Sequence, residues 1–376
     1  MSDPWVTEGA ARIAASAERE LEALVGVSSP SGDVRGAEEA IAVVSALLPE
    51  QARVERAPCS SPGHADDLIA RLPGSGRARI VLLGHLDTVV AHEAHRPLRR
   101  ENGRLIGSGS IDMKGGDVLA MGVLRLLAAQ PERFAEVALV LVVDEEWRIG
   151  PFAHVDRFAG WDACLCFEGG QHTPEGDDAV VVRRKAAGTL RVEAEGRSAH
   201  SGSAPERGIN ALLALAQAAQ AVAARHAPDG PERLTVVPTV LRAGEAFNVV
   251  PASGALTCDL RADSLEAFAE VREALPAEVG GARLKVRMER EWPGMDARAV
   301  SAPLRAAAAE RLGRPIVGVD RGGASDASYF ARVIPLSVDG LGPRGGGAHA
   351  PHEFVDGDSL QSRAEVALAL VAALTS

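Results

Sequence analysis

His85 and Asp87 are two residues whose types and spacing could do chemistry. They follow the apolar run Ile80–Leu83, which is typical of a strand buried on both faces of a parallel sheet. Open sheets of this kind bind ligands at the carboxyl ends of their strands. Because side chains two apart on an extended chain point the same way, Asp87 can fix the tautomer of His85 and direct its other nitrogen toward a metal ion. The alternative is a strand end that carries two solvated polar groups.

Two further apolar runs also stop at acidic residues. Val137–Val143 ends in Asp144-Glu145-Glu146, and Ala163–Phe167 ends in Glu168. The carboxyl ends of parallel strands share one sheet edge, so we expect these side chains to converge near His85. Like charges about 4 Å apart repel by roughly 1 to 4 kcal/mol in a polar environment. A divalent cation would remove that repulsion, which favours a metal site.

Asp112 lies in the glycine-rich stretch Gly107–Gly116, just before a helical pattern at Val118–Ala129. Glycine lets the backbone approach a ligand closely, and a helix start favours negative charge. The stretch has neither the Walker nor the dinucleotide-binding spacing, which excludes a phosphate-binding loop of those types.

Length and charge restrict the possible functions. A chain of 376 residues predicts two domains, with one large domain as the alternative. The net charge of -11 argues against nucleic-acid or anionic-membrane partners. No secretory signal and no apolar stretch of the roughly 20 residues that a membrane helix needs is visible. A reducing, cytoplasmic location is expected, because no metal or redox spacing links the cysteines: Cys59, Cys164, Cys166 and Cys258.

The order of elements predicts an insertion. Residues 187–290 are expected to form an inserted ferredoxin-like α+β domain with the order β-α-β-β-α-β. Its elements are predicted at Thr189–Glu195, Asn210–Arg225, Leu234–Leu241, Ala255–Leu260, Leu265–Leu275 and Leu284–Met288. Residues 1–186 and 291–376 then form an α/β domain with a mainly parallel sheet. Within it, Pro58–Asp67 is predicted to be a loop.

Together these motifs resemble a known family. The chain is similar to the zinc metallopeptidase family of glutamate carboxypeptidases, aminoacylases, acetylornithine deacetylases and succinyl-diaminopimelate desuccinylases. The resemblance runs from about Ile80 to Val355 through His85-x-Asp87, Asp112-Met113-Lys114-Gly115-Gly116, Glu145-Glu146, Glu168 and His349. It is greatest to the glutamate carboxypeptidase branch, through Arg197–His200 and Asn248–Pro251.

The resemblance implies two zinc ions, with Co²⁺ or Mn²⁺ as possible substitutes. His85 and Glu168 would bind one ion, Glu146 and His349 the other, and Asp112 would bridge both; imidazole and carboxylate ligands suit zinc. His352 is the rival of His349, which we prefer because Glu353 follows it in the family's His-x-x-x-Glu pattern.

The remaining implied roles concern catalysis and substrate. Glu145 would be the general base, and Asp87 would orient His85. His200 is either structural or, as the resemblance implies, supplied by the partner subunit of a homodimer to stabilise the oxyanion; residues 187–290 would then be the dimerisation domain. Asn248 could bind substrate, and Arg321 and Arg261 match positions that hold the substrate carboxylate. A surface ion pair is as good an explanation for Arg261.

The predicted function is a di-zinc hydrolase that cleaves an amide bond next to a free carboxylate, in N-acyl amino acids or short peptides. The alternatives are an N-acyl-amino-acid deacylase and a catalytically silent binding protein on the same scaffold. One departure from the family is Trp147-Arg148-Ile149, where small residues are usual. It leaves the shape of the substrate pocket open.

Overall fold

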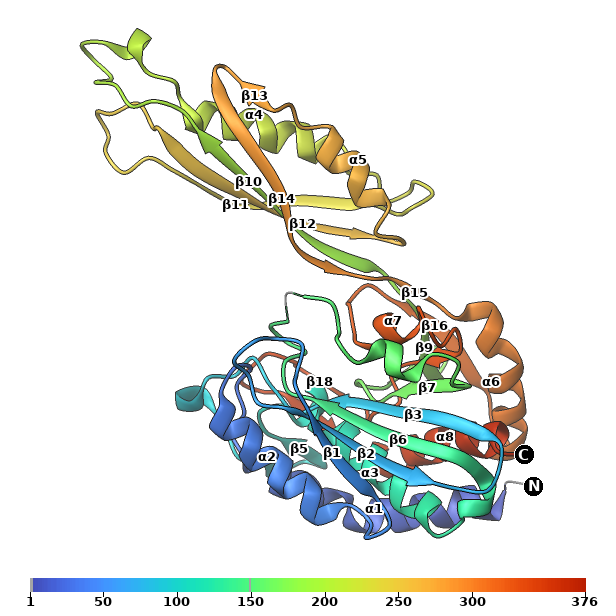
Figure 1. Ribbon diagram of the computed structural model, residues 1–376. Helices are drawn as coiled ribbons and strands as arrows, with labels where there is room; N and C mark the ends of the chain where they lie inside the picture. The colour runs from blue at the N-terminus through green and yellow to red at the C-terminus, as the bar shows by residue number, and fades with distance from the viewer. Residues whose placement is uncertain (1–2, 149) are drawn as a thin grey trace. The chain divides into compact units, whose positions relative to one another are not determined.

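The computed structural model describes residues 3–148 and 150–376, which divide into two compact units (Figure 1). Unit 1 holds the described residues of Met1–Arg183, Met295–Arg321 and Ser325–Ser376. Unit 2 holds Arg184–Gly294 and Gly322–Ala324. The predicted insertion at 187–290 lies within unit 2.

The central sheet of unit 1 has six strands in the order β1-β2-β6-β3-β7-β17. Neighbours from β6 to β17 run parallel, whereas β1 and β2 pair antiparallel at one side. The strands are β1 (Arg53–Ala57), β2 (Asp67–Pro73), β6 (Phe134–Val142), β3 (Ala78–His85), β7 (Ala163–Cys166) and β17 (Ser337–Val338). Apolar side chains bury the middle of the sheet on both faces, as the sequence predicted.

The register brings three strand ends together. His85 pairs with Val142, and Leu83 pairs with Cys166. The chain therefore leaves β3, β6 and β7 at one edge of the sheet, where the predicted acidic residues follow.

Helices pack against this sheet and against one another in unit 1 (Figure 1). They are α1 (Pro4–Val25), α2 (Val34–Leu47), α3 (Gly115–Ala128), α6 (Arg298–Leu312), α7 (Ala327–Phe330) and α8 (Ser359–Leu374). At the start of α3, a Cβ on Gly116 would lie 1.8 Å from the carbonyl oxygen of Phe167. Glycine is thus required there, because it lets the Asp112 segment approach the end of β7.

Smaller strands complete unit 1. Two sheets beside the central one follow the orders β15-β9-β16 and β18-β19-β5-β4, and β8 pairs with β9. Their bounds are β4 (Arg99–Glu101), β5 (Arg104–Ile106), β8 (Gln171–His172), β9 (Asp178–Arg184), β15 (Met295–Asp296), β16 (Ile316–Arg321), β18 (Gly345–Gly346) and β19 (Phe354–Asp356).

Unit 2 is built on an antiparallel sheet in the order β11-β12-β10-β14-β13, with two helices packed on its buried face (Figure 1). The elements are β10 (Ala186–Glu195), α4 (Ala211–Ala223), β11 (Thr235–Ala243), β12 (Ser253–Ala262), α5 (Ala267–Glu273), β13 (Glu278–Val279) and β14 (Ala282–Trp292). This is the predicted ferredoxin-like arrangement, so the predicted α/β fold class with an inserted α+β domain is confirmed.

Several strands were not predicted from the sequence. Asp67, assigned to a loop, begins β2, and β1 was not predicted. Both strands carry charged residues: Arg71 of β2 donates to Glu136 of β6 at 2.7 Å, which masks the apolar pattern of a buried strand. Among the described residues, no helix has both the length and the apolar character needed to cross a bilayer.

Candidate metal centre

His85, at the end of β3, is buried and has both ring nitrogens engaged. Its Nδ1 lies 3.1 Å from the carbonyl oxygen of Asp87, so the neutral ring carries its proton on Nδ1 and presents the lone pair of Nε2. That Nε2 lies 3.2 Å from Oδ1 of Asp112 and 3.8 Å from Oε1 of Glu168. His85, Asp112 and Glu168 thus form a first group whose ligand atoms all lie within 4.8 Å of one another.

A second group shares Asp112. His349 Nε2 lies 3.2 Å from Oδ2 of Asp112 and 3.3 Å from Oε2 of Glu146, and these ligand atoms also fall within 4.8 Å of one another. Asp112 therefore turns one carboxylate oxygen toward His85 and the other toward His349. Of the described residues, His352 belongs to neither group.

The donor set fits divalent cations. Imidazole and carboxylate groups are the ligands that zinc takes in catalytic sites. Glu146 Oε1 is buried, and within the described residues it has no hydrogen-bond partner, which is costly unless an ion or another donor satisfies it. Hydrogen bonds to Asp112 and Glu146 raise the pKa of His349 to about 10. The cluster thus stabilises positive charge at the position where a metal ion would supply it.

The same electrostatics acts on His85 and Asp112. Burial opposes the charged form of His85, but hydrogen bonds to Asp112 and Asp87 raise its pKa well above the ordinary value. Burial likewise opposes ionisation of Asp112, yet hydrogen bonds to His349 and His85 hold its pKa below the usual range. The Asp112 carboxylate is therefore ionised and able to bind cations.

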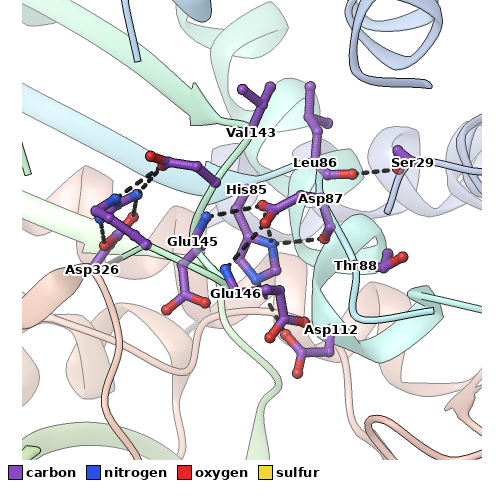
Figure 2. Close-up of polar contacts among 12 residues, drawn as sticks. Ser29, His85, Leu86, Asp87, Thr88, Asp112, Val143, Glu145, Glu146 and Asp326 are labelled. Carbon is purple, nitrogen blue, oxygen red and sulfur yellow. Dashed lines mark hydrogen bonds and ion pairs between the residues drawn. The ribbon is translucent and has the colours of Figure 1, made fainter. Parts of the chain in front are cut away.

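Asp87 ties two strand ends together. Besides facing His85, its two carboxylate oxygens each accept a backbone N–H at 3.1 Å, one from Glu145 and one from Glu146 (Figure 2). Burial opposes its charge, but its hydrogen bond with His85 leads the contacts that lower the pKa of Asp87. One ionised carboxylate thus orients the imidazole and fixes the turn after β6.

Glu145 lies beside the two groups and belongs to neither. Burial of its carboxyl group, together with the nearby Asp326 and Glu168 carboxylates, raises its pKa well above the ordinary value, against the opposing charge of His85. A carboxylate that binds a proton more tightly than usual is suited to general base catalysis.

Glu353 holds the Asp112 segment in place, a role that the sequence analysis did not predict. Its buried carboxylate accepts backbone N–H bonds from Gly109 and Ile111 at 2.9 Å and from Asp112 at 3.0 Å. Burial outweighs these bonds and raises its pKa to about 7. The only signal in the sequence was its spacing from His349.

The structure brings His200 and Asn248 together in unit 2. Ser201 N donates to the carbonyl oxygen of Asn248 at 3.0 Å, and His200 forms an isolated antiparallel β-bridge with Val249. His200 is exposed, and its Nδ1 accepts N–H bonds from Gly202 and Ser203 at 3.1 and 3.2 Å. The neutral ring therefore carries its proton on Nε2, which can act as a donor.

The two arginines differ in their surroundings. Arg261, on β12, forms two bonds of 3.1 Å with Asp259, as expected of a surface ion pair. Arg321, at the end of β16, is exposed and donates from Nε to Gln171 Oε1 at 2.9 Å.

Trp147 and Arg148, which depart from the family pattern, have opposite environments. Trp147 is 57% exposed, whereas Arg148 is completely buried. Ile149 lies outside the described residues.

Comparison with known proteins agrees with this geometry. Residues 81–373 match Peptidase family M20/M25/M40. The chain is 27% identical over 369 residues to carboxypeptidase G2 of Pseudomonas sp. (strain RS-16), covering 93% of this chain and 87% of that protein. It is 28% identical over 324 residues to the succinyl-diaminopimelate desuccinylase of Stenotrophomonas maltophilia (strain R551-3), covering 80% and 84%.

Solved structures share the fold. The Bacillus subtilis YXEP protein, described as a dinuclear metal-binding peptidase of the M20 family, superimposes with a TM-score of 0.71 at 16% identity and covers 97% of this chain and 99% of its own.

Proposed function

We propose, from the premise that this chain belongs to Peptidase family M20/M25/M40, that it is a di-zinc hydrolase that cleaves an amide bond adjacent to a free carboxylate. The proposed substrates are N-acyl amino acids or short peptides. The observation that carries the proposal is the Asp112 carboxylate, whose two oxygens face two separate groups of imidazole and carboxylate ligands.

In this proposal His85 and Glu168 would hold one zinc ion, Glu146 and His349 would hold the other, and Asp112 would be a ligand of both. When bound, zinc would supply Lewis acidity, which polarises the scissile carbonyl and makes a water molecule easier to deprotonate. Similarity to a dinuclear metal-binding peptidase supports the number of ions, and the mixed nitrogen and oxygen ligands support zinc, with Co²⁺ or Mn²⁺ as substitutes.

Glu145 is the proposed general base. Its carboxylate takes a proton from the attacking water and returns it to the leaving nitrogen, so that an amine departs rather than an amide anion. Asp87 supports this step, because it fixes the backbone N–H of Glu145 at 3.1 Å and holds His85 in the tautomer that exposes Nε2.

His200 is proposed to donate from Nε2 to the oxyanion, in the site of a second copy of the chain. A homodimer through unit 2 is supported by β11, an edge strand that exposes Val237, Val240 and Leu241. Unpaired strand edges readily pair with another chain. Asn248, which the structure brings together with His200, is proposed to bind substrate.

Arg321 is the proposed anchor for the substrate carboxylate. A guanidinium binds a carboxylate through two parallel hydrogen bonds, and the bond from Nε to Gln171 restricts the side chain before substrate arrives. Arg261 is the second candidate for binding the substrate carboxylate, although its guanidinium already donates two hydrogen bonds to Asp259.

A deacylase is the alternative, favoured by the similarity to a succinyl-diaminopimelate desuccinylase. Both functions use the same chemistry and differ in whether the acyl side of the bond is a peptide or a simple acid. A silent binding protein would be expected to lose a ligand or the base, and this chain keeps all of these residues.

The proposal is tested by hydrolysis of a panel of N-acyl amino acids and dipeptides with zinc-loaded protein and a chelated control. We expect metal-dependent release of one amino acid. Glu145→Gln should lower kcat by at least about 100-fold, because general base catalysis contributes that much, with metal content near wild type. Loss of metal from Glu145→Gln would instead make Glu145 a ligand, and full activity would exclude it as the base.

A further inference from the structure

Arg148 is a fully buried arginine placed three residues after the proposed base. Burying a guanidinium is strongly unfavourable unless charged partners surround it. Here Nε and Nη2 donate to Oδ1 of Asp144 at 2.9 and 2.7 Å. Nη2 also donates to Oδ2 of Asp326 at 3.0 Å, and Nη1 donates to Oδ1 of the same residue. Figure 2 shows these bonds at Asp326.

The two aspartates come from different parts of the fold. Asp144 lies two residues after the end of β6, and Asp326 directly precedes α7. Both are buried. The guanidinium also lies over the ring of Phe152, with 4.5 Å between Cζ and the ring centroid. Its planar fork therefore joins the turn after β6 to the start of α7.

Glu145 and Glu146 lie between Asp144 and Arg148, in a turn that these contacts hold in place. The backbone N–H of Arg148 donates to the carbonyl oxygen of Asp144 at 2.9 Å, so backbone and side-chain bonds both close the turn 144–148. On the other side, Asp87 accepts the N–H groups of Glu145 and Glu146. The turn is thus held on one side by Asp87, just after β3, and on the other by the bond from Arg148 to Asp326, just before α7.

We infer that Arg148 is a positioning residue for Glu145, acting through Asp144 and Asp326. The inference rests on the proposed function, since it needs Glu145 to be the base. A small residue at 148 could not make the bidentate link, and a lysine could not bridge both carboxylates, because an ammonium is a compact point charge rather than a fork. This positioning role would explain why an arginine stands at 148, where the family usually has a small residue.

The test compares Arg148→Met and Arg148→Lys with Arg125→Met. Arg125, on α3, also binds a carboxylate of another element: its Nη2 donates to both oxygens of Glu20 of α1 at 2.9 and 2.8 Å. It lies about 15 Å along the helix from its start near Asp112. All rates are divided by the amount of folded, metal-loaded protein. We expect Arg148→Lys to lower kcat by about 10-fold and Arg148→Met by about 100-fold, with KM changed less than 3-fold, since a misplacement of about 1 Å costs that much.

A second readout does not depend on activity. In metal-free protein, the backbone amides of Glu145 and Glu146 should exchange hydrogen faster in Arg148→Met than in wild type or Arg125→Met. Asp326→Asn should reproduce the kcat loss, and the double variant with Arg148→Met should lose no more than Arg148→Met alone. If Arg148→Met fails to fold, Arg148→Lys and Asp326→Asn carry the same comparison.

Wild-type kcat and wild-type exchange in folded Arg148→Lys and Asp326→Asn would overturn the inference. Glu145→Gln in the same series separates the two claims. If it is inactive while the Arg148 variants are normal, only the positioning role fails. If it retains full activity, the proposed base itself is wrong.

Discussion

At the scale of single residues, the site depends on side chains that each have two contacts. Asp87 orients His85 and binds the turn after β6, and Asp112 faces two ligand groups. Each of these carboxylates is held ionised against the cost of burial by hydrogen bonds. Replacing Asp87 or Asp112 by asparagine would weaken both contacts of that residue. Such a substitution should therefore lower activity more than the loss of a residue that has only one partner.

Arg321 gives a prediction about substrate selection. Arg321→Ala should lower kcat/KM for substrates with a free C-terminal carboxylate by about 100-fold, because a charge-assisted, bidentate contact of up to about 3 kcal/mol is lost. Matching C-terminal amides should change little. Arg332→Ala is the control, since it removes a positive charge from unit 1 at a position without a proposed role. Equal losses on acids and amides would exclude the carboxylate contact.

At the scale of elements, the strand ends determine where chemistry is possible. β3, β6 and β7 lie side by side and parallel, so His85, Glu145, Glu146 and Glu168 meet without any long loop. The helix α3 can approach this edge only because Gly116 has no side chain. The glycine-rich stretch is therefore a packing requirement that also places Asp112.

Asp67, the first residue of β2, gives a prediction about pH. It is fully buried, accepts the N–H of Val143 at 3.1 Å, and lies 3.2 Å from Nε2 of His154. Burial raises its pKa from 3.8 to about 6. The folded state thus holds this proton more tightly than the unfolded state. The stability it contributes is complete below pH 3.8 and is lost as pH rises through about 6.

Asp67→Asn should remove this dependence, because the amide keeps an acceptor for Val143 and never ionises. Relative to wild type, the variant should gain about 3 kcal/mol in free energy of unfolding between pH 3.5 and pH 7, because folding raises the pKa of Asp67 from 3.8 to about 6. Urea unfolding of chelated protein at both pH values measures the gain. The exposed Asp229→Asn is the control, and a gap between Asp67→Asn and wild type that stays constant with pH would contradict the prediction.

At the scale of the whole molecule, the proposed homodimer predicts complementation. Glu145→Gln and His200→Ala subunits should each be inactive alone. After subunit exchange, half of the dimers are mixed, and each mixed dimer has one site with both residues, so activity should recover to about a quarter of wild type. Exchange is verified by mass tags on the two subunits. Verified exchange with no recovery would show that His200 does not act in trans.

Local sequence patterns predicted the main elements, and the family resemblance implied the ligand residues of the candidate metal centre. Apolar runs predicted β3, β6 and β7, because a strand buried on both faces must be apolar throughout. Polar residues where those runs stop predicted the site, since parallel strands end at a common edge. Strands that carry charged residues do not show a continuous apolar run and were not predicted. One example is β2, in which Arg71 pairs with Glu136.

Only the tertiary structure decided the contacts between distant segments. Glu353 accepts three N–H groups more than 240 residues away in sequence, and Arg148 binds Asp326, which is 178 residues further along the chain. Local periodicity carries no information about such pairs, because it records which side of an element is buried and not which partner covers it. The sequence alone therefore determined which residues could do the chemistry, and the packing of β3, β6, β7 and α7 decided what holds them in place.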